Sequence, residues 1–157
     1  MRAKAGDKTM LYSSILDIHA FGMTAAAVLF MAAEFFLVAG GGGSATMARF
    51  AFGASRFGNL LAMLGMLAGI ALLYLGGWSL TTPWLLLSFA LIAIMMVVSR
   101  RFVQPWQAKF QAAVAGGTRA ELGALAGDRK ALIGRVAVIA LFALIAAVMM
   151  LKPDLLA

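Results

Sequence analysis

Cysteine is absent from the 157-residue chain, and histidine occurs once, at His19. The absence of thiols excludes disulfides, thiolate metal sites and iron–sulfur clusters. A single histidine also prevents bis-histidine ligation of a haem within one chain. Gly40–Gly43 lacks the Lys-Ser/Thr ending of a phosphate loop and is more typical of a turn. No nucleophile triad or pair of hydrolytic carboxylates is recognisable, so we expect no catalytic residues and favour a protein that is not an enzyme.

Charged residues are also scarce, at 12% of the chain against 64% hydrophobic residues. Soluble domains are about half apolar and about a quarter charged. So few charges could not cover the core of a soluble fold of this size, which predicts an integral membrane protein. The net charge of +7 does not indicate nucleic acid, because Lys and Arg lie outside the apolar runs, where they would face anionic lipid headgroups. The expected partner is the lipid bilayer.

Four apolar segments approach the length of about 20 residues that crosses a bilayer as a helix. They predict a single membrane domain over residues 1–157. Its expected fold class is all-α, an integral membrane up-and-down four-helix bundle. The expected spans are about 16–39, 57–75, 84–98 and 132–151, with an amphipathic cytoplasmic connection at about 100–128. The polar segment before Met10 is expected to be a disordered tail or, alternatively, to reflect an upstream choice of start codon, with translation starting at Met10 instead of Met1.

Helix starts and breaks can be placed between these spans. Ser44 and Thr82 are suited to N-cap the second and third helices. The sequence TRAE, beginning at Thr118, has the spacing of a capping box and predicts a short connecting helix. Pro105 predicts a kink or a restart of the helix after the third span.

The distribution of basic residues predicts the orientation. Nine lie in the connections between spans 1 and 2 and between spans 3 and 4, and four lie on the other side. The nine are Arg49, Arg56, Arg100, Arg101, Lys109, Arg119, Arg129, Lys130 and Arg135, and the four are Arg2, Lys4, Lys8 and Lys152. The positive-inside rule therefore places these two connections in the cytoplasm and both termini outside.

Three ionisable residues, Asp17, His19 and Glu34, lie in or beside the first span. Fifteen residues separate His19 from Glu34, which is about 22 Å along a helix, so the two cannot act on one small substrate. Arg49 and Arg56 approach Glu34 from the same side and lie two helical turns apart on one face. We expect a structural ion pair between Glu34 and one of these arginines rather than a proton relay.

His19 has two interpretations. It could be an axial ligand to haem b held between helices, completed by a methionine, an open position or a His19 from a second copy. The alternative is a histidine near the membrane surface that hydrogen-bonds to a neighbouring helix or a headgroup. No other cofactor or metal is expected.

The second span contains GMLAG, a GxxxG motif formed by Gly65 and Gly69. Small residues at this spacing let helix backbones approach closely in a membrane. The motif could form a homodimer, or it could pack against another span of the same bundle. We favour the second interpretation, because GxxxG is common in membrane proteins.

Several stretches together suggest a family. The first-span IHAFGMTAAAVLF, the second-to-third-span AGIALLYLGGWSLTTPWLLLSFAL and the final VMMLKPDL resemble an uncharacterised bacterial family of small four-helix integral membrane proteins, a domain of unknown function. The resemblance covers most of the chain and implies a bacterial cytoplasmic (inner) membrane location. In that membrane, the termini that the positive-inside rule places outside are periplasmic. The architecture is more distantly similar to the copper-resistance protein D membrane domain and to the four-helix protoporphyrinogen oxidases. Only His19 matches a haem-associated position of the latter, whose third-span lysine and additional histidine are missing here.

Two functions therefore remain. The first is a non-catalytic accessory or structural subunit of a larger membrane complex, with a homodimer as a further partner to consider. The second is a haem-binding redox or haem-metabolism protein that uses His19.

Overall fold

The computed structural model describes residues 2–40 and 43–152, with side chains from residue 8 onward. Nearly all of the described chain is helical, and no strand occurs within it. The elements are α1 (Arg2–Ala39), α2 (Ala45–Gly76), α3 (Pro83–Val98), the π-helix η1 (Ser99–Val103), α4 (Gln104–Gly116), α5 (Arg119–Ala126) and α6 (Arg129–Leu151). The prediction of an all-α bundle is confirmed.

Within residues 2–40 and 43–152, four stretches of helix are long and apolar enough to cross a membrane. They are Lys8–Ala39, Ala45–Gly76, Pro83–Gly116 and Arg129–Leu151. By length and composition, the chain is a multi-pass integral membrane protein.

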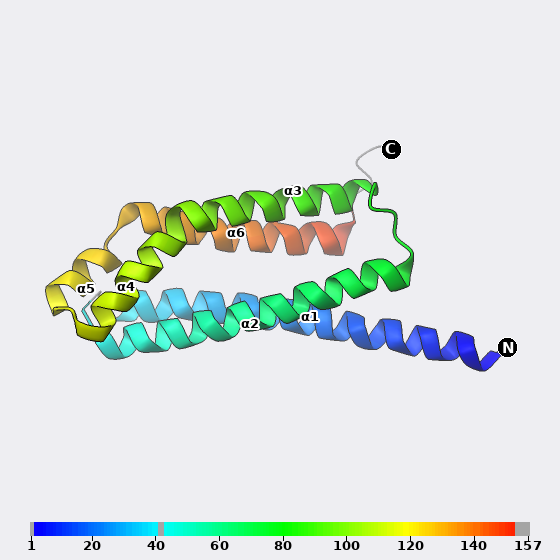
Figure 1. Ribbon diagram of the computed structural model, residues 1–157, viewed down its shortest axis with the longest axis horizontal. Coiled ribbons are helices and arrows are strands. Elements are labelled where there is room, and N and C mark those ends of the chain that lie inside the picture. The colour runs from blue at the N-terminus through cyan, green and yellow to red at the C-terminus, as the bar shows by residue number, and fades with distance from the viewer. Residues whose placement is uncertain (1, 41–42, 153–157) are drawn as a thin grey trace.

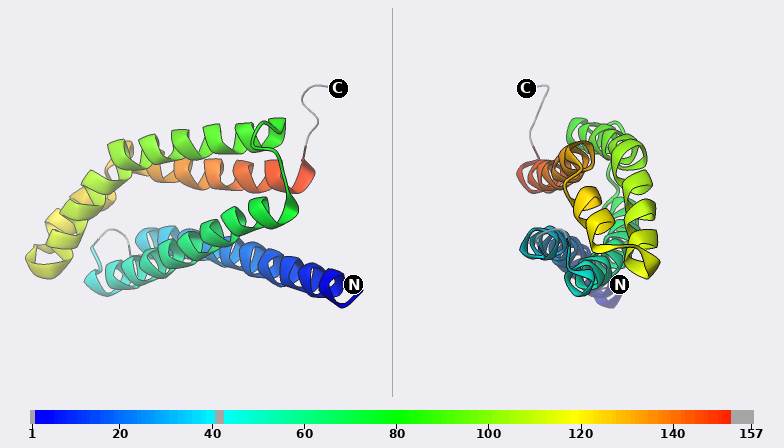
Figure 2. Two further views of the ribbon diagram at one scale, coloured as in Figure 1. Left: turned by 45° about the vertical axis from the view of Figure 1, so that its right-hand side comes forward. Right: turned by 90° about the vertical axis from the view of Figure 1, so that its left-hand side faces the viewer.

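The bundle consists of two helical hairpins, α1 with α2 and α3 with α6 (Figure 1). At one end of the molecule, α4 and α5 bridge the two hairpins. At the other end, α2 diverges from α1 and approaches α6 before the α2–α3 turn (Figure 2). We call the first the basic end, because the nine basic residues assigned above to the cytoplasmic connections lie in its helices. At the basic end, a core of buried side chains joins the hairpins. It consists of Ala48, Trp106, Phe110, Leu122 and Ala131.

The observed helix caps explain where the chain turns. Ser44 accepts a hydrogen bond from the backbone of α2, and Thr118 forms both bonds of a capping box with Glu121. Thr82 precedes α3 as expected, but its hydroxyl donates to the carbonyl of Ser79 at 2.6 Å instead of capping the helix. Gly77 ends α2 with φ of 62°, a left-handed conformation that glycine adopts without steric cost.

Two predicted boundaries differ from the structure. The chain continues from α3 through η1 into α4 with helical backbone throughout, bending where a separate connection was expected. Pro105 supplies no N–H, and its ring clashes with the carbonyl four residues earlier, so the wider turns of η1 accommodate it. The prediction of a tail before Met10 is also wrong, because α1 begins at Arg2.

Candidate functional site

Glu34 forms an ion pair across the two hairpins. Nε of Arg135, on α6, lies 2.8 Å from Oε1 of Glu34 on α1. The predicted partners Arg49 and Arg56 are therefore wrong. Both belong to α2 and are exposed, whereas α6 crosses α1 at the level of Glu34 and places Arg135 against it. This is the one ion pair within 4 Å that residues 8–40 and 43–152 form.

The guanidinium of Arg135 is buried among aromatic side chains. Its Cζ lies 4.1 Å from the centre of the Trp106 ring, and that ring stacks on Phe110 at 4.9 Å. The indole N–H of Trp106 donates to the carbonyl of Leu125 at 2.7 Å, which fixes the ring. Arg135 is only 7% exposed, and its Nη1 has no hydrogen-bond partner among the described residues. Nε also lacks the alignment of a hydrogen bond, so Glu34 and the ring hold the cation by electrostatic attraction.

A close approach of α6 to η1 helps to place Arg135. A Cβ on the preceding residue, Gly134, would lie 2.5 Å from Cβ of Phe102, which is closer than real Cβ contacts come. Neither Gly134 nor Arg135 was predicted from the sequence as a site residue. The sequence does contain a signal for Arg135, which is a lone cation within the apolar run LIGRVAV. Such residues face the interior of a bundle and form ion pairs there.

His19 lies at a separate place, between α1 and α2. Its Nδ1 is 2.7 Å from the carbonyl oxygen of Gly65, so Nδ1 carries the proton and donates it. The ring covers Gly69, where an added Cβ would lie 3.0 Å from Cε1. An added Cβ at Gly65 would lie 2.8 Å from Sδ of Met23. Gly65 and Gly69 therefore face α1 of the same chain.

The ionisable residues of the first span do not form one site. Asp17 is exposed, His19 contacts α2, and Glu34 contacts α6. Within the described part of the chain, no three or more His, Cys, Asp or Glu side chains gather as a metal site.

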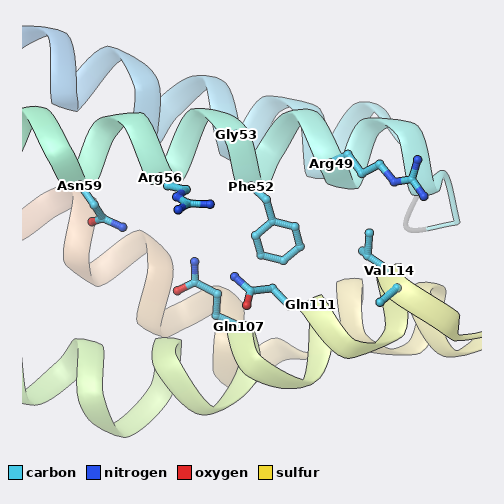
Figure 3. A pocket seen from close by; sticks show the side chains of 9 residues that line it. Arg49, Phe52, Gly53, Arg56, Asn59, Gln107, Gln111 and Val114 are labelled. Carbon is cyan, nitrogen blue, oxygen red and sulfur yellow. The ribbon is translucent and has the colours of Figure 1, made fainter.

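A third feature, unforeseen from the sequence, is a hollow of about 710 Å³ between α2 and α4 at the basic end. Side chains from the two helices line it and include Arg56, Asn59, Gln107 and Gln111, which extend into the space between the helices, while Arg49 lies toward the start of α2 (Figure 3). We call it the basic groove. Its lining consists of Arg49, Phe52, Gly53, Arg56, Asn59, Gln107, Gln111, Val114 and Ala115.

Comparisons of the chain with protein families, with curated proteins and with solved structures find no match. The function must therefore be inferred from the geometry of these three features.

Proposed function

We propose that the protein is a non-catalytic subunit of the bacterial inner membrane that packs against a larger membrane complex. The principal support is that three polar side chains within the spans, Glu34, His19 and Ser88, serve the protein's own packing. Glu34 pairs with Arg135, His19 bonds to the carbonyl of Gly65, and the buried Ser88 donates to the carbonyl of Trp84 at 2.8 Å. Such contacts join helices or close a helix on itself, as expected of a structural bundle. Membership of the resembled family and periplasmic termini are part of this proposal.

The surface of α1 offers a place for the partner. Beyond its contacts with α2 and α6, α1 exposes a stripe of large apolar side chains at intervals of three, four and seven residues, the spacing of a helix-packing seam. The stripe consists of Phe21, Val28, Met31, Phe35 and Val38. Phe21 is 74% exposed and Phe35 is 67% exposed. A transmembrane helix of a partner could pack along this stripe.

Photo-crosslinking in intact membranes tests this proposal. A photoreactive amino acid at Phe35 is expected to give one protein adduct of defined mass. Ile133 of α6 is the matched control, because it lies near the same end and is 69% exposed against 67% for Phe35. We expect no discrete protein adduct from Ile133. A stripe that yields only lipid adducts, or a control that yields the same adduct, would contradict the proposal.

The second candidate, haem binding, is favoured by one observation at His19. Histidines that ligate metals almost always donate their other ring N–H to a carbonyl, carboxylate or water, and Nδ1 of His19 donates to Gly65 in this way. The neutral ring would present Nε2 to an iron.

A visible spectrum separates the two candidates. The protein purified in mild detergent is expected to show no Soret band, because the ring of His19 lies against Gly69, between two helices of one hairpin. A Soret band that disappears in His19→Ala, and persists in a control such as Asp17→Asn, would support haem binding instead.

A further inference from the structure

The basic groove is lined by hydrogen-bond donors that the chain does not use. Arg49 and Arg56 make no ion pair or hydrogen bond with any described residue, and the same holds for Asn59, Gln107 and Gln111. Each guanidinium carries five N–H donors, and each amide adds two. A hollow of about 710 Å³ therefore collects two cations and three amides, all without partners in the described chain.

No carboxylate balances the two arginines. The lining contains no acidic residue. The described acidic side chains near this end are engaged elsewhere: Glu34 pairs with Arg135, Glu121 caps α5, and Asp128 caps α6. The groove can thus accept an anion from outside the chain, and its donors favour one with several acceptor oxygens, as in a phosphate group.

The surface beside the groove indicates that the ligand also has an apolar part. Arg49 and Arg56 are seven residues apart and lie on one face of α2. The same face continues along the helix as exposed apolar side chains, Leu60 at 47%, Met63 at 51% and Leu67 at 58% exposed. An occupant with a phosphate head and an apolar tail would match both parts, whereas free phosphate would match only the first.

The opposite wall of the groove is formed by α4, an amphipathic helix of the kind that lies at a membrane surface. α4 buries Trp106 and Phe110 on one side and presents Gln107, Lys109 and Gln111 on others. Basic pockets between helices on the cytoplasmic side of a membrane are suited to the headgroups of anionic lipids.

We propose that the basic groove binds the phosphate headgroup of an anionic phospholipid, whose acyl chains lie along Leu60, Met63 and Leu67. Arg49 and Arg56 contact the phosphate oxygens, and the amides of Asn59, Gln107 and Gln111 donate to the remaining acceptors of the headgroup. The proposal does not depend on the partner complex proposed above, since the lipid site faces α4 and the partner stripe lies on α1.

Titration of the detergent-solubilised full chain with single lipids, read by native mass spectrometry, tests the site. We expect phosphatidylglycerol to bind more tightly than phosphatidylcholine of the same acyl chains. The variant Arg49→Gln/Arg56→Gln is expected to lose about thirtyfold in affinity for phosphatidylglycerol. Its fold should be unchanged, because neither side chain forms a hydrogen bond or an ion pair with another described residue.

Two further variants distinguish a built site from general attraction to charge. Arg100→Gln/Arg101→Gln removes the same charge from exposed positions of η1 outside the groove and should change the affinity by less than about threefold. Gln107→Leu/Gln111→Leu leaves the charge unchanged, removes donors from the α4 wall, and should weaken binding by about tenfold. Equal losses in both arginine pairs, or no loss in the glutamine pair, would overturn the proposal.

A competition experiment distinguishes a bound lipid from bound free phosphate. Inorganic phosphate, added to the protein already loaded with phosphatidylglycerol, is expected not to displace the lipid at equal concentration, because it makes no contact with the apolar stripe. Displacement at equal concentration would overturn the assignment of a lipid.

Discussion

Replacing Glu34 with leucine is expected to lower the free energy of unfolding by about 3 kcal/mol. The substitution leaves the guanidinium of Arg135 in place, with its side chain only 8% exposed, after removing its carboxylate. Loss of one partner from a buried ion pair is strongly destabilising, because the remaining charge stays buried without compensation. The Glu34 side chain is 21% exposed, which places the expected loss at the lower end of the range of about 3–5 kcal/mol.

Removing both charges should be far less harmful than removing one. The free energy of unfolding of Glu34→Leu/Arg135→Met is expected to lie within about 1 kcal/mol of that of the original protein, because an apolar pair of similar volume avoids the cost of burying the ions. The flexible methionine can also pack on the ring of Trp106, which the guanidinium contacts at 4.1 Å. Unfolding by sodium dodecyl sulfate from mild detergent micelles, followed by circular dichroism, would measure all variants.

The arginines of α2 provide the control. Arg49→Met and Arg56→Met should each change the free energy of unfolding by less than about 0.5 kcal/mol, since both side chains are exposed and neither forms a hydrogen bond or an ion pair with another described residue. If either variant were as unstable as Glu34→Leu, the partner of Glu34 would be one of these residues and not Arg135.

The fold class follows from the sequence because it depends on composition and on local signals. The scarcity of charge indicates lipid as the solvent, and the structure indeed has four helices of sufficient length. Ser44 and the capping box at Thr118 act through neighbouring backbone groups, so their roles could be predicted without any tertiary contact.

The partner of Glu34 could not be predicted in the same way. It depends on where α6 crosses α1, and this crossing is set by packing between residues far apart in sequence, including the contact of Phe30 with Phe142 at 5.9 Å. Proximity along the chain favoured Arg49 and Arg56 instead. A search for a lone charge inside an apolar run would have included Arg135.

Only one of the two walls of the basic groove could be predicted from the sequence. Its α2 wall follows from helical periodicity, which places Arg49 and Arg56 on one face. Its α4 wall depends on the bend at η1, which brings Gln107 and Gln111 opposite the part of α2 that carries Phe52 and Arg56. Pro105 indicates that the helix changes course, but a single proline fixes neither the direction of the bend nor the widening to a π-helix.

Gly134→Ala is expected to lower the free energy of unfolding by about 2 kcal/mol. Alanine normally favours a helix, but here its Cβ would lie 2.5 Å from Cβ of Phe102. The obstacle is attached directly to the backbone of η1, so no rotation of the Phe102 side chain can remove it. Either α6 or η1 must therefore move.

Gly53→Ala is the matched control within another helix. An added Cβ at Gly53 has no atom within 4 Å, so this variant should gain up to about 1 kcal/mol from the higher helix propensity of alanine. The same chemical change is thus expected to have opposite effects at the two glycines. A Gly134→Ala variant as stable as Gly53→Ala would contradict the close approach of α6 to η1.

The double variant Gly134→Ala/Phe102→Ala identifies which atoms collide. Because Phe102→Ala keeps Cβ and removes only the ring, the double variant should remain destabilised, whereas a clash with the ring would be relieved. Displacement of η1 should also move Trp106 away from Arg135, because Trp106 follows η1 by three residues. With Trp78 and Trp84 replaced by phenylalanine, Trp106 fluorescence should change in Gly134→Ala and stay constant in Gly53→Ala. A change in stability without that spectral change would mean that the close contact does not position the Glu34–Arg135 pair.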